Sequence, residues 1–228
     1  MIIAQYFAAV IVGYLLGSIP FGLLIAKRTA KVDIRQYGSG KTGMTNVLRA
    51  AGRKAAAMVV VLDASKGVLA VVFAGLIVGK GYLMVGNFGL GSLLAQVMAA
   101  LAAMAGHNWS VFLRFRGGSG VATFFGGLIA LCPWVALFSG EILILGAGLT
   151  RFVSLGSIAG VVGTYAILVP LTVVNSFPIE YLIYAILGTI MIIVMHRGNI
   201  VRLISGKERK LGEKAEEIDL PSSEEGRG

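Results

Sequence analysis

Long runs of apolar residues alternate with short polar segments along this chain of 228 residues. A helix that crosses a bilayer needs roughly 20 mostly apolar residues. The first such run continues into basic residues without a small-residue cleavage site, which is typical of an anchor that is retained. Runs near this length predict spanning helices at Ile2–Ala26, Ala55–Gly79, Tyr82–Ala105, Val153–Val174 and Tyr181–Met195.

One further apolar run, Val121–Thr150, is long for one span and short for two. Pro133 interrupts it, and proline removes a helical hydrogen bond and clashes with the preceding turn. Two short helices broken near Pro133 give seven spans, and 18 of the 20 Lys and Arg residues then lie on one side. Because basic residues favour the cytoplasmic side, we expect an all-α polytopic membrane protein of seven transmembrane helices, with its N-terminus outside and its C-terminus cytoplasmic.

Composition agrees with a lipid environment. Apolar residues make up 57% of the chain and charged residues only 14%, against about 25% charged residues in soluble domains. The net charge of +9 could indicate nucleic-acid binding, but in membrane proteins such charge first reports topology and the binding of anionic headgroups. We expect one membrane domain over residues 1–211 and a disordered acidic tail over residues 212–228, with the lipid bilayer and not nucleic acid as partner.

The first polar segment that carries chemistry is Tyr37–Arg49. Its glycines let backbone N–H groups converge on an anion, and a helix starting near Thr45 would point its N-terminus at a phosphate. Gly-Ser-Gly-Lys-Thr resembles a P-loop locally, but Arg35 stands where the first glycine is needed and no strand precedes it. An ordinary glycine-rich interfacial loop fits equally well. The candidate site residues of this segment are Ser39, Gly40, Lys41, Thr45, Asn46 and Arg49.

A second polar segment covers residues 106–123. The run Gly117, Gly118, Ser119 and Gly120 can expose backbone donors just before a helix begins. His107 could hold the loop by hydrogen bonds or exchange a proton, and a purely structural histidine is an equal alternative.

A third polar segment begins at His196. His196, Asn199 and Arg202 are spaced three apart, so one helical face would carry all three. The alternative is a basic cap that extends its charges into water from the end of the last span.

Charged residues also occur inside the second span. Asp63 and Lys66 are three apart, which permits a neutralising ion pair, and we favour a structural pair over a catalytic one. Near the start of a later span, Ser154 and Ser157 offer two hydroxyls on the side that carries the basic loops.

These segments offer many anion donors. We find no metal-ligand cluster, no HxxxxD acid-base motif and no Ser-His-Asp set that residue order alone would nominate. We therefore expect no metal and no cofactor, and a chemistry that rests on phosphate binding and electrostatic stabilisation.

Taken together, the motifs resemble those of the PlsY family, the membrane acyl-phosphate:glycerol-3-phosphate acyltransferases. The resemblance runs from Gly17-Ser-Ile-Pro-Phe-Gly22 to Glu208, and includes Asp63–Gly67 and Arg151–Ile158. It implies a monomeric enzyme of the bacterial inner membrane whose active site faces the cytoplasm. Glycerol-3-phosphate would attack a long-chain acyl phosphate, a phosphate oxygen would accept the proton, and lysophosphatidic acid would be the product for phospholipid biosynthesis.

The same resemblance implies roles for individual residues. Ser39, Thr45, Asn46, His196 and Asn199 would be catalytic. The substrate-binding residues would be Gly40, Arg49, His107, Gly117, Gly118, Gly120, Ser154, Ser157 and Arg202. We add Lys41 and Ser119 to the substrate-binding residues because they lie within the same motifs.

Three positions depart from the family pattern, and at one of them Ser110 stands where the second motif usually has a proline. Lys41 replaces an asparagine, and Ser119 replaces a phosphate-binding lysine. We hypothesise that Lys41 supplies the charge that Ser119 lacks. The rival interpretation is a homologue that binds phospholipid precursors without catalysis, and a small-solute transporter is a further alternative.

Overall fold

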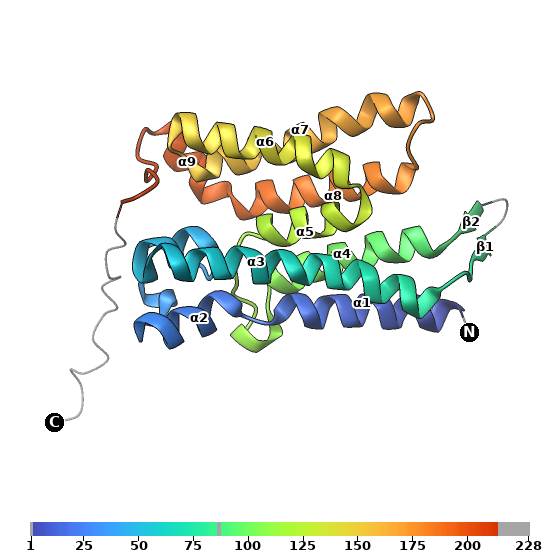
Figure 1. Cartoon of the computed structure of the whole chain (residues 1–228), viewed down its shortest axis with the longest axis horizontal. Helices are drawn as coiled ribbons and strands as arrows, with labels where there is room; N and C mark the ends of the chain where they lie inside the picture. Colours follow the sequence, from blue (N-terminus) through green and yellow to red (C-terminus); the bar gives the residue numbers. More distant parts are fainter. Residues whose placement is uncertain (1, 86–87, 214–228) are drawn as a thin grey trace.

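The computed structural model describes residues 2–85 and 88–213, and within them the chain forms an elongated helical bundle (Figure 1). Two short 3-10 helices, η1 (Ile34–Gln36) and η2 (Val111–Leu113), lie in the polar loops. The α-helices are α1 (Ile2–Ser18), α2 (Phe21–Ala30), α3 (Met44–Val78), α4 (Ser92–Asn108), α5 (Val121–Leu131), α6 (Pro133–Thr150), α7 (Val153–Val173), α8 (Ile179–Met195) and α9 (Arg197–Ile204).

Small residues let the central helices approach one another closely. α1 packs along α4 and α3, and a Cβ atom on Gly17 would lie 1.9 Å from the Ala103 carbonyl oxygen. The same holds between α3 and α5, where a Cβ atom on Gly126 would lie 1.9 Å from the Ala64 carbonyl oxygen. Glycine at these points allows the backbone contact on which helix association in membranes depends.

The prediction for Tyr82–Ala105 was wrong in its first ten residues. Strands β1 (Leu83–Val85) and β2 (Phe88–Leu90) pair antiparallel there, and helix α4 begins only at Ser92. Glycines at positions 81, 86, 89 and 91 disfavour a helix and suit a tight hairpin. The described structure is therefore mostly helical, with one small hairpin.

The break expected near Pro133 is confirmed. Helix α5 ends at Leu131 and α6 begins at Pro133. Helix α3 starts earlier than predicted, at Met44, and continues through a non-helical Gly52 with φ of 85° and ψ of 179°. The end of the first polar motif therefore belongs to the same long helix as the second predicted span.

Four described helical segments are long and apolar enough to cross a bilayer: Ile2–Ala30, α3, α6 and α7. Helices α8 and α9, bent by 63° at His196, would make a fifth if counted as one broken span. Helices α4 and α5 have 17 and 11 residues, which is short of the usual spanning length. The protein is thus an integral membrane protein with four to five helices of spanning character.

The polar segments gather at one end of the bundle. Helix α9, the end of α2 and the start of α3 lie at the left in Figure 1, whereas the hairpin and the N-terminus lie at the opposite end. Of the predicted acidic tail, only Gly212 and Glu213 belong to the described residues.

Candidate active site

A cavity of about 400 Å³ opens at the end of the bundle where the polar segments meet. One part of its wall is polar and combines all three polar motifs. The other part is apolar and comes mainly from α5 and α6. The polar lining comprises Ser39, Lys41, Thr45, Arg49, Asp63, His107, Ser119, Ser154, Ser157, His196, Asn199, Arg202, Glu208 and Arg209.

Asn46 organises the first loop from inside. It is 3% exposed, and its Nδ2 donates to the carbonyl oxygens of Tyr37 (2.8 Å), Lys41 (2.9 Å) and Ile34 (3.1 Å). Its Oδ1 accepts from the Ser39 backbone N–H at 3.4 Å. Asn46 lies behind the cavity wall, and these contacts hold Ser39 and Lys41 in place at the rim.

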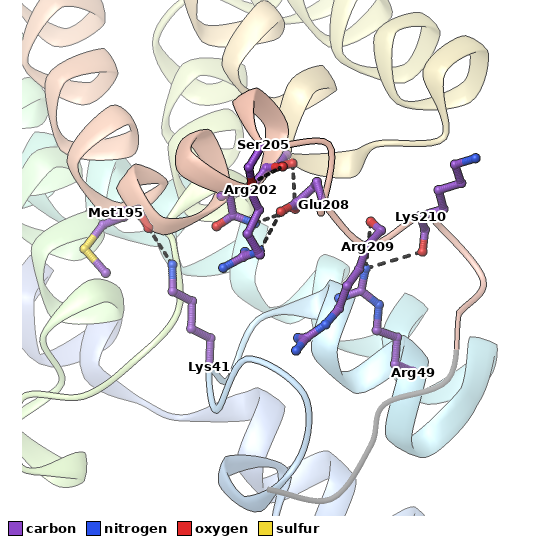
Figure 2. Close-up of polar contacts among 10 residues, drawn as sticks. Lys41, Arg49, Met195, Arg202, Ser205, Glu208, Arg209 and Lys210 are labelled. Atoms are coloured by element: carbon purple, nitrogen blue, oxygen red, sulfur yellow. Dashed lines mark hydrogen bonds and ion pairs between the residues drawn. The ribbon is translucent and has the colours of Figure 1, made fainter.

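Lys41 reaches across the cavity to the last turn of α8. Its Nζ donates to the Met195 carbonyl oxygen (Figure 2), one of the carbonyls that a helix leaves unpaired at its C-terminus. Burial lowers the pKa of the Lys41 ammonium, and the nearby Arg202 and Arg197 charges lower it further. Since an ammonium group has three donors, Lys41 keeps donors for an anion in the cavity.

The second loop is fitted around His107. The His107 ring packs against Gly118, where a Cβ atom would lie 2.1 Å from Nε2, so only glycine fits. The Gly118 N–H donates to the His107 carbonyl oxygen at 3.1 Å, and the Thr42 N–H donates to the Gly117 carbonyl oxygen at 3.4 Å. These contacts join the first and second loops into one wall.

The predicted ion pair inside α3 is confirmed. Lys66 Nζ lies 2.7 Å from Asp63 Oδ1, and both side chains are 3% exposed. His107 Nδ1 lies 3.5 Å from the same carboxylate oxygen. The two charges of the pair therefore neutralise each other, and Asp63 also holds His107 at the start of the second loop.

In the third motif, His196 lies at the bend between α8 and α9. Its Nδ1 is 2.8 Å from the Ile192 carbonyl oxygen. Because a carbonyl can only accept, Nδ1 carries the proton, and Nε2 is the nitrogen that can accept one in the neutral ring.

Glu208 holds the rest of this motif together. Its Oε2 accepts from Arg202 Nε at 2.7 Å (Figure 2). Its Oε1 accepts from Asn199 Nδ2 at 2.7 Å and from Ser154 Oγ at 2.9 Å. The Glu208 side chain is only 5% exposed. Asn199 and Ser154 therefore each donate a hydrogen bond to this carboxylate.

The residues after Glu208 cross to the other side of the cavity. Arg49 Nη2 donates to the carbonyl oxygens of Arg209 (3.2 Å) and Lys210 (3.4 Å) (Figure 2). The Leu211 N–H donates to the Arg151 carbonyl oxygen at 2.7 Å. Within residues 2–85 and 88–213, the buried Arg49 Nε has no hydrogen-bond partner.

Most of the predicted site residues come together at this cavity. Four of them, Gly40, Asn46, Gly117 and Gly118, do not line it and shape its loops instead. Sequence reasoning missed the contribution of Glu208 to the site, and its only signal was an isolated acid in a basic stretch. The sequence also did not indicate that α5 and α6 form the apolar wall of the cavity, because the residues of this wall look like ordinary lipid-facing positions.

Residues 7–206 match the family model described as glycerol-3-phosphate acyltransferase. The chain belongs to the glycerol-3-phosphate acyltransferase family. A glycerol-3-phosphate acyltransferase 3 of Dehalococcoides mccartyi is 63% identical over 94% of this chain and 100% of its own length. A glycerol-3-phosphate acyltransferase of Clostridioides difficile is 42% identical over 95% of this chain and its full length.

Solved structures of the family share the fold. The crystal structure of PlsY, an integral membrane glycerol 3-phosphate acyltransferase, in its glycerol 3-phosphate form superposes with a TM-score of 0.78 and 38% identity, covering 91% of this chain and 96% of that one. Its lysophosphatidic acid form gives a TM-score of 0.74 at 36% identity, covering 91% and 95%. The resemblance inferred from the motifs to the PlsY family is thus confirmed.

Proposed function

We propose that this protein transfers a fatty acyl group from acyl phosphate to the 1-hydroxyl of glycerol-3-phosphate, giving lysophosphatidic acid and phosphate. One observation carries the proposal: a single cavity joins a cationic, hydroxyl-rich end to an apolar wall on α5 and α6. This combination suits two phosphate-bearing reactants of which one has a hydrocarbon chain. The names and activities of the relatives support the same reaction.

In the proposed reaction, the glycerol hydroxyl oxygen bonds to the acyl carbonyl carbon. The bond between that carbon and the phosphate oxygen breaks, and phosphate leaves with the electron pair and takes up the hydroxyl proton. Lys41 and Arg49 would stabilise the charge that develops on the leaving phosphate, while Ser39 and Thr45 would donate hydrogen bonds. Preorganised donors of this kind need no metal or cofactor.

Other residues would act through their neighbours. Asn46 would position Ser39 and Lys41, and Glu208 would position Asn199 and Arg202 by the hydrogen bonds described above. His196 would present Nε2 as an acceptor, because Nδ1 is bound to the Ile192 carbonyl.

The cation at position 41 would compensate for Ser119. Both side chains line the same cavity, so a charge at Lys41 can reach a phosphate that a lysine at 119 would otherwise bind. We expect Lys41→Asn to abolish acyl transfer, and the added change Ser119→Lys to restore it. Full activity of the single Lys41→Asn variant would contradict this compensation.

We further propose seven transmembrane segments, with the N-terminus outside, and a monomer in the bacterial inner membrane. The gathering of the basic polar loops at one end of the bundle supports a site on the cytoplasmic face. The domain would extend over residues 1–211.

The test is direct. Purified protein is incubated with palmitoyl phosphate and labelled glycerol-3-phosphate, and lysophosphatidic acid is measured. One observation, Ser119 in place of the family lysine, favours a homologue that binds precursors without catalysis. Binding of both substrates without product would establish that second candidate, and solute uptake into proteoliposomes without product would indicate a transporter.

A further inference from the structure

The apolar part of the cavity is a groove between helices. Helix α5 supplies Val121, Phe125 and Ile129, which lie four apart and so share one face. Helix α6 supplies Ala136, Gly140 and Ile144 with the same spacing. The two faces diverge from the turn at Cys132, where α5 ends and α6 begins.

The groove has a polar mouth and an apolar far end. Ser119 and Gly120, just before α5, belong to the polar mouth, whereas Ile129 and Ala136 lie next to the turn. From Val121 to Ile129 the helix rises by about 12 Å. An alkyl chain whose phosphate lies at the mouth can therefore extend over this length before it meets the turn.

The sides of the groove face lipid as well as the cavity. Ile129 is 52% exposed and Ile144 is 68% exposed, although both line the cavity. A ligand with a hydrocarbon chain could therefore enter sideways from the bilayer while its head reaches the cations. The acyl chain of the donor and product is the occupant that fits both features.

Gly140 leaves a gap midway along this groove. Among the neighbouring atoms, a Cβ there would approach only Phe125 Cε1, at 4.0 Å. Other glycines of this region are explained by close packing, since Cβ atoms on Gly156 and Gly160 of α7 would lie 2.5 Å and 2.7 Å from α6 atoms. No such contact requires glycine at position 140, although glycine weakens a helix interior.

We propose that Gly140 determines the acyl-chain length that the enzyme accepts, by keeping the groove open beyond its midpoint. A larger side chain would fill the space that the distal methylenes of a long acyl chain occupy and would leave the shorter chains unaffected. This inference rests on the proposed acyl transfer and adds a specificity-determining residue to it.

The experiment compares kcat/KM for butanoyl phosphate, whose chain ends before Gly140, and palmitoyl phosphate, with labelled glycerol-3-phosphate as acceptor. Each methylene that loses its apolar surroundings weakens binding about fourfold. If Gly140→Leu displaces two methylenes or more, the palmitoyl-to-butanoyl ratio should fall more than about tenfold. Ile129→Ala should also lower the ratio, because only the long chain reaches this end of the groove and loses apolar contact there.

Gly148→Leu is the matched control. Gly148 lies on the same helix but does not line the cavity, and a Cβ atom there would meet no neighbouring atom within 4 Å. This control should leave the ratio unchanged. An unchanged ratio in folded Gly140→Leu and Ile129→Ala would overturn the inference while leaving acyl transfer intact.

Failure of the proposed function gives a different result, namely no transfer from either donor by the unmodified protein. The groove is then tested by calorimetric binding of butanoyl and palmitoyl lysophosphatidic acid. Gly140→Leu should weaken palmitoyl binding selectively, and equal effects on both chains would refute the role of Gly140.

Discussion

The ion pair between Asp63 and Lys66 gives a sharp test of the energetics. Lys66→Met removes the cation and leaves the Asp63 carboxylate, 3% exposed, without its closest partner. Breaking a buried pair in this way costs about 3–5 kcal/mol, whereas replacing both members costs much less. His107 Nδ1, 3.5 Å from the carboxylate, offers a second partner, so we expect a value near the lower end of this range.

The assay is thermal unfolding in detergent, followed by far-UV circular dichroism at one scan rate. For a chain of this size, 3 kcal/mol corresponds to a fall of about 6–12 °C in Tm. The double variant Asp63→Asn/Lys66→Met should recover more than half of that loss. An exposed pair is the control: Lys27, 54% exposed, lies 3.7 Å from Asp33, and Lys27→Met should change Tm by less than about 3 °C.

Equal Tm values for Lys66→Met and the double variant would refute the reasoning, because the single variant alone leaves an uncompensated charge. A large effect of Lys27→Met would refute it as well, since burial would then not be the deciding variable.

Three further predictions concern the site. Glu208→Gln keeps an acceptor but loses the charge opposite Arg202, so kcat/KM in the acyl-transfer assay should fall about 10- to 100-fold. Gly118→Ala places a methyl group against the His107 ring, and we expect loss of transfer with a destabilisation of about 1–3 kcal/mol in thermal unfolding. Because the pKa of Lys41 is lowered by burial, its charge is lost earlier as pH rises, and the alkaline fall in kcat/KM should move to higher pH in Lys41→Arg, since arginine stays charged.

What the sequence predicted well depends on local geometry. The Asp63–Lys66 pair followed from the three-residue spacing on a helix, and the break at Pro133 followed from the chemistry of proline. The length of apolar runs located most helices. The hairpin between Leu83 and Leu90 was missed because the run remains mostly apolar, and its length was given more weight than the four glycines that interrupt it.

The sequence could not show contacts between residues that are far apart along the chain. Glu208 meets Ser154, which is 54 positions away, and no spacing rule predicts a contact between a coil residue and a separate helix. Asn46 reads as a substrate contact in its motif, yet its Nδ2 is used by three backbone carbonyls of its own loop. Gly140 looks like one small residue among many, because an apolar sequence does not distinguish lipid, protein core and cavity.

The crossing of residues 208–211 over the cavity has a consequence for biosynthesis. Chains are synthesised from the N-terminus, and domains begin to fold during synthesis. The earlier helices can assemble before Glu208 has left the ribosome, but Asn199 and Arg202 lack the carboxylate that orients them until it arrives. A fragment that is truncated before residue 208 would therefore insert into the membrane with an incomplete site, so we expect activity only in chains that include residues 208–211.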